Sequence, residues 1–319
     1  MSSAPGAVTN GVVGTSRIER ASSLRVLLAL LVMVAFFGGS LPAYKIASAS
    51  FGPATINLGR FGLAVACISL VSLRRPRGTA VPTRALLVVG FFGLGLMTLF
   101  MSIGVDRGSA VIGSIVVGLE PIGVALAGVL LVGDRPSPTA KLALLVGFSG
   151  ALAASGIFTQ KTGPSPIVPM LLLLGTVTTF SIYTANVRRI GSGVDPLRVT
   201  QITQIGALFF IVPACLLDVF DGGMIRDSGV SAKAAGAVVF LGIGSAIAYV
   251  VLCSVLATVP SHRVAVSMFL TPLFGVFFSW LLAGEDLHLR DAVGGLLVLA
   301  ALWISEHGAR KEHPPISGT

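Results

Sequence analysis

The sequence predicts an all-α membrane protein of ten transmembrane helices, arranged as two inverted repeats of five. This prediction rests on a shortage of charge, ten apolar segments of membrane length, and residues that recur between the two halves. Of the 319 residues, 54% are hydrophobic and 11% are charged, and the mean hydropathy is +0.93. Soluble domains carry about 25% charged residues. The composition therefore excludes an ordinary soluble enzyme, a disordered chain and a nucleic-acid-binding domain, despite a net charge of +9.

Ten apolar segments are long enough to cross a bilayer, because a helix needs about 20 apolar residues to do so. Their apolar runs are unbroken, unlike the alternating strands of a barrel. The predicted spans are 26–46, 53–73, 85–105, 110–132, 139–157, 167–187, 197–217, 234–257, 264–283 and 289–305. Short loops and two tails account for the remainder, so no soluble domain is expected.

Four regions follow from these spans. We expect a disordered cytoplasmic tail over residues 1–23, which are rich in Ser, Gly and Ala. Residues 24–158 form the first repeat and residues 159–306 the second. A short cytoplasmic tail, residues 307–319, ends the chain.

The positions of Lys and Arg predict the orientation. With the N-terminus in the cytoplasm, 15 of the 22 basic residues lie on the inner side, 6 on the outer side, and Arg60 within a span. Cytoplasmic loops carry the excess of Lys and Arg, so we expect a multi-pass protein of the plasma (inner) membrane with both termini cytoplasmic. Cleavage of the first span as a signal peptide is the alternative. Its apolar core is too long for that, and its loss would put Arg74 and Arg75 on the wrong side.

The two halves repeat. At a constant offset of 151, residues 119–134 align with residues 270–285. Identical residues then stand at Leu119, Pro121, Leu130, Leu131 and Gly133, and Asp134 meets Glu285. At an offset of 143, Lys45 aligns with Arg188, and a proline opens the second span of each half. Because five crossings are an odd number, the second copy must be inverted relative to the first. Secondary transporters use this plan and place their site near the midplane, between the halves.

These segments resemble a known family. Residues 119–134 are similar to the "L-E-P-x-x-A … L-x-x-G-E" segment of EamA-type transporters of the drug/metabolite transporter superfamily, and residues 271–285 are similar to its second copy. Residues 37–40 resemble the W-G-x-x signature of the first span, with Phe in place of Trp, and Pro53 and Arg60 match the second span. The resemblance covers about residues 25–306, and it implies a transporter that exports metabolites.

Glu120 is the clearest candidate for chemistry. A charge at membrane depth costs at least ~2.5 kcal/mol on insertion scales, so it is a functional hypothesis by default. Glu120 lies midway along its span and directly before Pro121. A proline within a helix frees a backbone carbonyl, and we expect helix breaks at Pro121 and at its counterpart Pro272. Glu120 is predicted to bind a cationic group or to carry a proton. The alternative is a carboxyl group that is permanently protonated, or paired with Arg, and only ties helices together.

Further polar side chains share helix faces in both halves. Asn57 and Arg60 are three residues apart on one helix. We expect Arg60 to hold a substrate carboxylate or to pair with Glu120. The alternative is that the Arg60 side chain extends to the outer membrane interface. The other pairs at this spacing are Tyr183 with Asn186, and Gln201 with Gln204. Uncharged donors and acceptors of this kind orient small ligands. Ordinary hydrogen bonding between helices is their alternative.

The function expected from these features is secondary transport. We expect export of a small metabolite, such as an amino acid or related zwitterion, by alternating access and with protons as the coupling ion. An uncoupled exchanger or uniporter of the same fold, and a membrane scaffold or sensor, are the alternatives. The sequence has no phosphate-binding loop, zinc-protease motif or serine-hydrolase motif. No enzyme activity, metal, cofactor or nucleic acid is expected; the partners are the substrate and the lipid bilayer, with the chain a monomer or homodimer.

Overall fold

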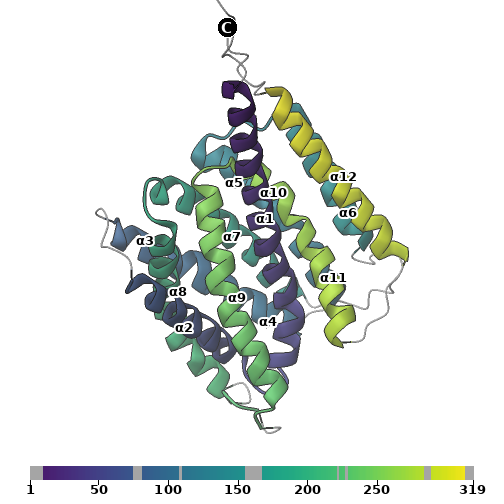
Figure 1. Ribbon diagram of the computed structural model, residues 1–319. Helices are drawn as coiled ribbons and strands as arrows, with labels where there is room; N and C mark the ends of the chain where they lie inside the picture. Colours follow the sequence, from purple (N-terminus) through teal and green to yellow (C-terminus); the bar gives the residue numbers. More distant parts are fainter. Residues whose placement is uncertain are drawn as a thin grey trace, which may run out of the picture.

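A computed structural model describes residues 10–74, 81–107, 110–154, 167–220, 223–226, 229–283 and 289–312. Within these ranges the chain is a bundle of helices (Figure 1). Its only β pairing there is an isolated bridge between Phe51 and Ile225. The prediction of an all-α fold is confirmed for this part of the chain.

Helices of the first half follow the first five predicted spans. The third span is three consecutive elements, because a π-helix interrupts it, and a second π-helix ends the fourth. The elements are α1 (Asn10–Ala47), α2 (Pro53–Ser72), α3 (Thr83–Val89), η1 (Gly90–Gly95), α4 (Leu96–Arg107), α5 (Ala110–Ala127), η2 (Gly128–Val132) and α6 (Pro138–Ala154).

Helices of the second half follow the last five predicted spans. The ninth span is divided into two helices at Phe269, which is not helical. The elements are α7 (Ile167–Gly191), α8 (Pro196–Phe220), α9 (Ala232–Leu256), α10 (Ser261–Met268), α11 (Leu270–Ala283) and α12 (Leu289–Glu312).

Length and composition support membrane crossing for part of this set. Five helical stretches of the described chain are long and apolar enough to cross: Val26–Ala47, Pro53–Ser72, Thr83–Gly104, Pro196–Phe220 and Ala232–Leu256. Three shorter apolar helices are Gly118–Val132, Pro138–Ala153 and Ala292–Ser305. The chain is therefore a multi-pass membrane protein, and the full count of ten crossings remains a prediction.

The helices at the two ends of the chain are longer than expected. Helix α1 begins at Asn10, within the segment assigned to a disordered tail, and α12 continues to Glu312, beyond residue 306. Extending an existing helix adds a hydrogen bond for each residue fixed and needs no new nucleus, so a span can extend its helix into a polar segment. The boundary between residues 158 and 159, Glu285 and the last residues of the C-terminal tail lie outside the described residues.

The packing of the helices has a two-fold pattern. Helix α1 packs on α9 and α11, while α7 packs on α4 and α5. Helix α2 packs on α8, and α6 packs on α12. Exchanging each helix for its counterpart in the other half leaves these pairings unchanged, which is the relation that an inverted repeat requires. Figure 1 shows α6 and α12 side by side at one edge of the bundle.

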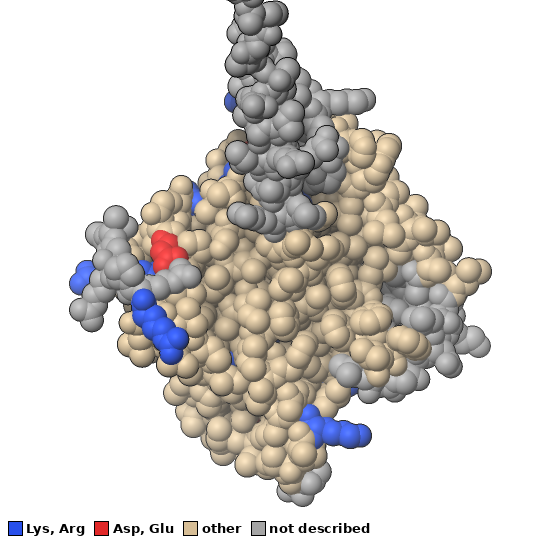
Figure 2. All heavy atoms as spheres, in the orientation of Figure 1, with Lys and Arg blue, Asp and Glu red and all other residues tan. Residues whose placement is uncertain are grey.

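The surface and the interior divide by polarity. On the face that Figure 2 shows, uncharged side chains cover the centre, and the charged side chains lie toward the margins. Both tryptophans, Trp280 on α11 and Trp303 on α12, are exposed on the outside. All three tyrosines of the chain, Tyr44, Tyr183 and Tyr249, are buried. A surface of this kind suits lipid as the surrounding solvent.

Two glycines allow the interrupted third span, α3 with η1, and α8 to meet backbone to backbone. A Cβ atom on Gly90 would overlap the carbonyl oxygen of Thr203, and one on Gly206 would overlap that of Leu87. Each helix thus contributes a glycine at the point where it meets the backbone of the other. Small residues allow this close approach in membranes, where packing rather than the hydrophobic effect drives association.

Candidate functional site

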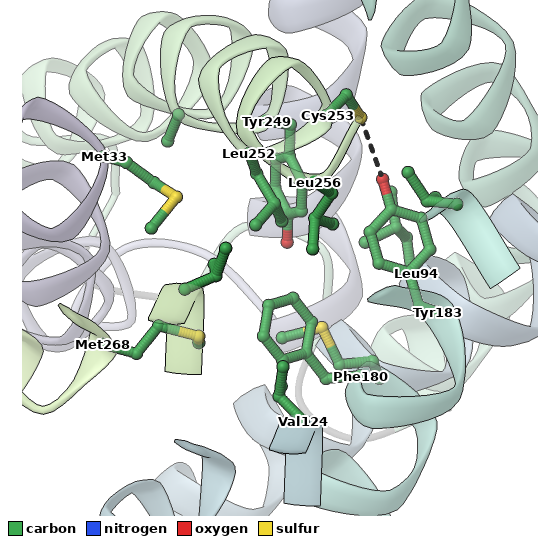
Figure 3. Packing of buried hydrophobic residues seen from close by; sticks show 14 of the residues in the cluster. Met33, Leu94, Val124, Phe180, Tyr183, Tyr249, Leu252, Cys253, Leu256 and Met268 are labelled. Carbon is green, nitrogen blue, oxygen red and sulfur yellow. Dashed lines mark hydrogen bonds between the residues drawn. The ribbon is translucent and has the colours of Figure 1, made fainter. Parts of the chain in front are cut away.

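A cavity lies between the two halves of the bundle. Its volume is about 40 Å³, it is open on one side, and helices from both halves line it. The lining residues are Phe37, Ser40 and Leu41 of α1, Arg60 of α2, Met97 and Met101 of α4, Glu120 of α5, Phe180 of α7, Tyr249 of α9 and Thr271 of α11. Helices α6, α8 and α12 contribute none of these residues. Figure 3 shows Phe180 and Tyr249 turned toward one another at the centre of the bundle.

Arg60 is held inside the bundle by neutral hydroxyl groups. Its side chain is 3% exposed, so it does not snorkel to the outer interface. Its Nε donates to Ser245 Oγ of α9, and its Nη1 donates to the Tyr44 hydroxyl at 3.2 Å. The guanidinium also lies over the rings of Tyr44 and Phe61, 5.6 and 5.4 Å from their centroids. It has no carboxylate partner among the residues that the structure describes.

Asn57 supports Arg60 indirectly. Its side-chain oxygen accepts the hydrogen bond that the Tyr44 hydroxyl donates. Its amide nitrogen donates to the carbonyl of Pro53 at 3.0 Å and to Ser102 Oγ at 3.1 Å. Asn57 is fully buried and does not line the cavity. It therefore orients Tyr44 toward Arg60, and this network ties α1, α2 and α4 together.

Glu120 lines the same cavity as Arg60, but the two side chains form no ion pair. Glu120 makes no hydrogen bond with any residue in the described part of the chain. Tyr249 lines the same cavity as Glu120 and Arg60. Buried charges in proteins are normally paired with an opposite charge. An acid and a base that are both without such a partner in one cavity leave room for a ligand that carries both charges.

The two prolines act differently on their helices, and the break expected at Pro121 is absent. Helix α5 continues through Pro121, and Glu120 is helical. A proline inside a helix leaves one backbone carbonyl without its N–H donor. In a membrane protein, neighbouring helices can supply a replacement partner for that carbonyl. In the second repeat the helix does stop, at Phe269, and resumes at Leu270, just before Pro272.

In the second half, Tyr183 and Gln204 are buried beside the site without lining the cavity. The Tyr183 hydroxyl lies 3.4 Å from Thr203 Oγ1 and 4.0 Å from Cys253 Sγ, the contact drawn in Figure 3. Gln204 Nε2 donates to the carbonyl of Ser245 at 3.4 Å, while its Oε1 is buried without a partner. Gln204 thus contacts the residue that holds Arg60.

Gln201 and Asn186 lie elsewhere. Gln201 Nε2 donates to Ser69 Oγ at 2.9 Å, which joins α8 to α2. Asn186 Nδ2 donates to the carbonyl of Ile182 within its own helix at 2.8 Å. Neither residue lines the cavity. Both residues make ordinary hydrogen bonds within or between helices, which was the alternative to a role in ligand binding.

Sequence reasoning missed Tyr44, Ser245, Tyr249 and Thr271, which complete the site. Two signals were available. The chain has only three tyrosines, and a side chain with a buried hydroxyl needs a partner. Thr271 also stands at the repeat position of Glu120, at the offset of 151.

Polar contacts join the halves at both ends of the bundle. At one end, Arg188 of α7 forms an ion pair with Asp134 at 2.7 Å and donates to Ser261 Oγ at 2.9 Å. The backbone N–H of Ser261 donates to the same Asp134 oxygen at 3.0 Å. At the other end, Asp218 of α8 accepts from the backbone N–H and the hydroxyl of Thr55 at 2.6 and 2.7 Å, so it caps α2.

Comparison with known proteins identifies relatives across the chain. The model of the EamA-like transporter family matches residues 24–156 and again residues 167–305. An "uncharacterized transporter" of Archaeoglobus fulgidus is 23% identical over 278 residues, which are 87% of this chain and 97% of the relative. The "uncharacterized transporter YyaM" of Bacillus subtilis is 24% identical over 288 residues, 86% of this chain and 92% of the relative. A solved crystal structure superposes with a TM-score of 0.75 at 18% identity, over 91% of this chain and 99% of that one, and this likeness shows the fold alone.

Proposed function

Since this chain belongs to the EamA-like transporter family, and is therefore a membrane transporter, we propose that it is a secondary transporter that works by alternating access through the cavity between its halves. We place it in the plasma (inner) membrane, with ten crossings and both termini in the cytoplasm. The main packing contacts between two helices recur between their counterparts in the other half. This recurrence supports two inverted five-helix repeats.

One observation carries the choice of substrate. Arg60 and Glu120 line one cavity, and neither has a partner of opposite charge among the described residues. A guanidinium binds a carboxylate through parallel hydrogen bonds, and Glu120 can neutralise an ammonium group. The walls between them are aromatic and thioether side chains, which suit an apolar substituent. We therefore propose that the substrate is a small zwitterion, such as an amino acid or a related metabolite.

Supporting roles follow from the contacts. Asn57 positions Tyr44, and Gln204 positions Ser245, so both act on Arg60 through another residue. Tyr183 packs beside the cavity wall formed by Phe180 and Tyr249. Gln201 and Asn186 stabilise helices rather than bind substrate.

Export driven by proton antiport is the coupling that we propose. Glu120 is the acid in the cavity, so a proton and the substrate's ammonium group compete for it, and release of one permits binding of the other. An untargeted comparison of metabolites released by cells with and without the protein identifies the substrate. Proteoliposomes loaded with it then allow the flux to be measured with and without a pH gradient.

Glu120→Gln tests this coupling. We expect the variant to fold and to lose the dependence of flux on the pH gradient, because an amide cannot carry the proton. Gln201→Ala, a change outside the cavity, should keep that dependence. Unaltered coupling in Glu120→Gln contradicts proton carriage by this residue. Counterflow of substrate without any ion gradient in the wild type identifies an exchanger or uniporter instead.

A further inference from the structure

Thr271 occupies in the second repeat the position that Glu120 occupies in the first. Leu119, Glu120 and Pro121 correspond to Leu270, Thr271 and Pro272 at the offset of 151. The two residues come from counterpart helices, α5 and α11, and both line the cavity. The repeat therefore brings two related positions, one acidic and one hydroxylic, to the same space.

The hydroxyl group of Thr271 has no hydrogen-bond partner among the residues that the structure describes. The side chain is 7% exposed, and its Oγ1 is buried without a hydrogen bond. Every other threonine whose side chain the structure describes makes one. A buried hydroxyl left in this way costs free energy, so a ligand that uses it is the explanation to test.

Thr271 lies directly after an interruption in its helix. Threonine within a helix usually donates to the carbonyl three or four residues before it, as Thr98 does to Leu94 at 2.8 Å. Thr271 is the second residue of α11, directly after the break at Phe269. The carbonyls three and four residues before it belong to Met268 and Ser267 of the preceding helix, α10, and its hydroxyl donates to neither of them.

Close packing fixes Thr271 in position. A Cβ atom on Gly38 of α1 would collide with the backbone oxygen of Thr271 and with Phe274. Phe37 and Ser40, on either side of this contact in α1, line the same cavity. Helix α1 therefore lies against α11 at this point, and the hydroxyl of Thr271 is held at the cavity wall.

We infer that Thr271 is a specificity-determining residue that contacts the substrate beside Glu120, which rests on the proposed function. A primary ammonium group has three N–H donors. Glu120 supplies the opposite charge, and Thr271 Oγ1 accepts one of the remaining hydrogen bonds. The site then selects a primary ammonium group over an N-trimethylated one, which has no N–H to donate.

A cysteine in place of Thr271 tests the location without any knowledge of the substrate. Cys67, Cys215 and Cys253 are first replaced by Ala, and Thr271→Cys is labelled with methanethiosulfonates that carry a primary ammonium, a trimethylammonium or a sulfonate group. We expect the primary ammonium reagent to react fastest. In a second variant that also carries Glu120→Gln, the ratio of the labelling rate of the primary ammonium reagent to that of the sulfonate reagent should fall at least about tenfold. One charge-assisted hydrogen bond contributes about this much. Ser192→Cys, on an exposed connection, is the control, and Glu120 should not affect its labelling.

Two further variants separate binding from folding. Thr271→Val removes the hydroxyl at constant shape, and Thr271→Ser retains it. Because the hydroxyl has no structural partner, the Val variant should unfold at the same temperature as the wild type or higher. Its KM for the released zwitterion should rise about tenfold, while the Ser variant should remain near the wild type.

The outcomes distinguish the two proposals. No labelling of Thr271→Cys, or equal rates for all three reagents, overturns the role of Thr271 and leaves transport untouched. A lower unfolding temperature for Thr271→Val indicates a structural role and also overturns it. Labelling as expected without flux of any released metabolite contradicts the proposed function instead.

Discussion

At the scale of single residues, the site depends on how one buried cation is held. Arg60 has two neutral hydroxyl partners, Ser245 and Tyr44, and Tyr44 is in turn held by Asn57. A carboxylate partner would have neutralised the guanidinium within the protein. Hydroxyl groups orient it and leave its charge available to a substrate.

Tyr44→Phe should weaken this arrangement while keeping the aromatic ring beside Arg60. The change removes the bond to Arg60 and leaves the buried Asn57 oxygen without its donor. We expect a loss of about 1–3 kcal/mol in unfolding free energy and a higher KM for the zwitterion. Chemical unfolding in detergent and flux in proteoliposomes measure the two effects. Tyr183→Phe, which loses only long contacts of 3.4 and 4.0 Å, is the control, and an equal effect there contradicts this account.

The sequence indicates some of these residues and not others for a physical reason. Glu120 and Arg60 stand out because a charge is costly at membrane depth, and the structure places both in the cavity. Asn186 and Gln201 also belong to polar pairs three residues apart, as Asn57 does. Their side chains, however, bond to the Ile182 carbonyl and to Ser69, away from the cavity. Spacing determines which residues share a face of a helix, and it does not reveal which helix lies opposite.

At the scale of elements, packing decides what a proline or a glycine does. Proline opens α2 and α8 at their first residue, yet Pro42, Pro121 and Pro213 lie within continuous helices. In the ninth span the helix stops at Phe269, just before Pro272. Sequence rules identified the helices, because apolar length is a strong signal. They could not tell an interrupted helix from a continuous one, since that depends on the neighbours.

Gly90→Ala should destabilise the contact between η1 and α8. The added methyl group meets the backbone of Thr203, which cannot move aside as a flexible side chain could. We expect a loss of about 1–3 kcal/mol, the usual cost of overpacking. Gly62→Ala on α2, where a Cβ would meet nothing within 4 Å, should gain up to about 1 kcal/mol from helix propensity. Thermal unfolding of both variants checks the difference, and two equal changes would refute it.

At the scale of the whole molecule, the halves are joined at each end by a polar cluster and separated between them by the cavity. Arg188, Asp134 and Ser261 form one cluster, and Asp218 with Thr55 forms the other. Alternating access requires the two ends to open in turn. Contacts of this kind between the halves are the ones that such a movement must break and remake.

A double-mutant cycle on Arg188→Gln and Asp134→Asn measures the first cluster. The pair is partly buried, at 21% and 10% exposure, so we expect a coupling energy of about 0.5–3 kcal/mol in unfolding. Arg189→Gln, at the exposed neighbouring position, should change stability by no more than about 0.5 kcal/mol. Additive effects of the two changes would mean that the pair contributes nothing to holding the halves together.

Whole-molecule features were only partly readable from the sequence. Each predicted span overlaps helical residues in the part of the chain that the structure describes, because hydropathy and the bilayer thickness are simple constraints. The offset between Lys45 and Arg188 showed that the halves correspond, but not that Arg188 pairs with Asp134. Contacts between helices depend on side-chain shape, which periodicity does not record.

The placement of the aromatic residues has a spectroscopic consequence. Trp280 and Trp303 are exposed on the outside of the bundle, and neither lines the cavity. Tryptophan emission from this protein therefore reports the bilayer: brominated acyl chains should quench it, while a solute bound at the centre should leave it unchanged. An optical signal for occupancy has to come from the interior, and replacing Phe180 by tryptophan, in an otherwise tryptophan-free chain, would provide one.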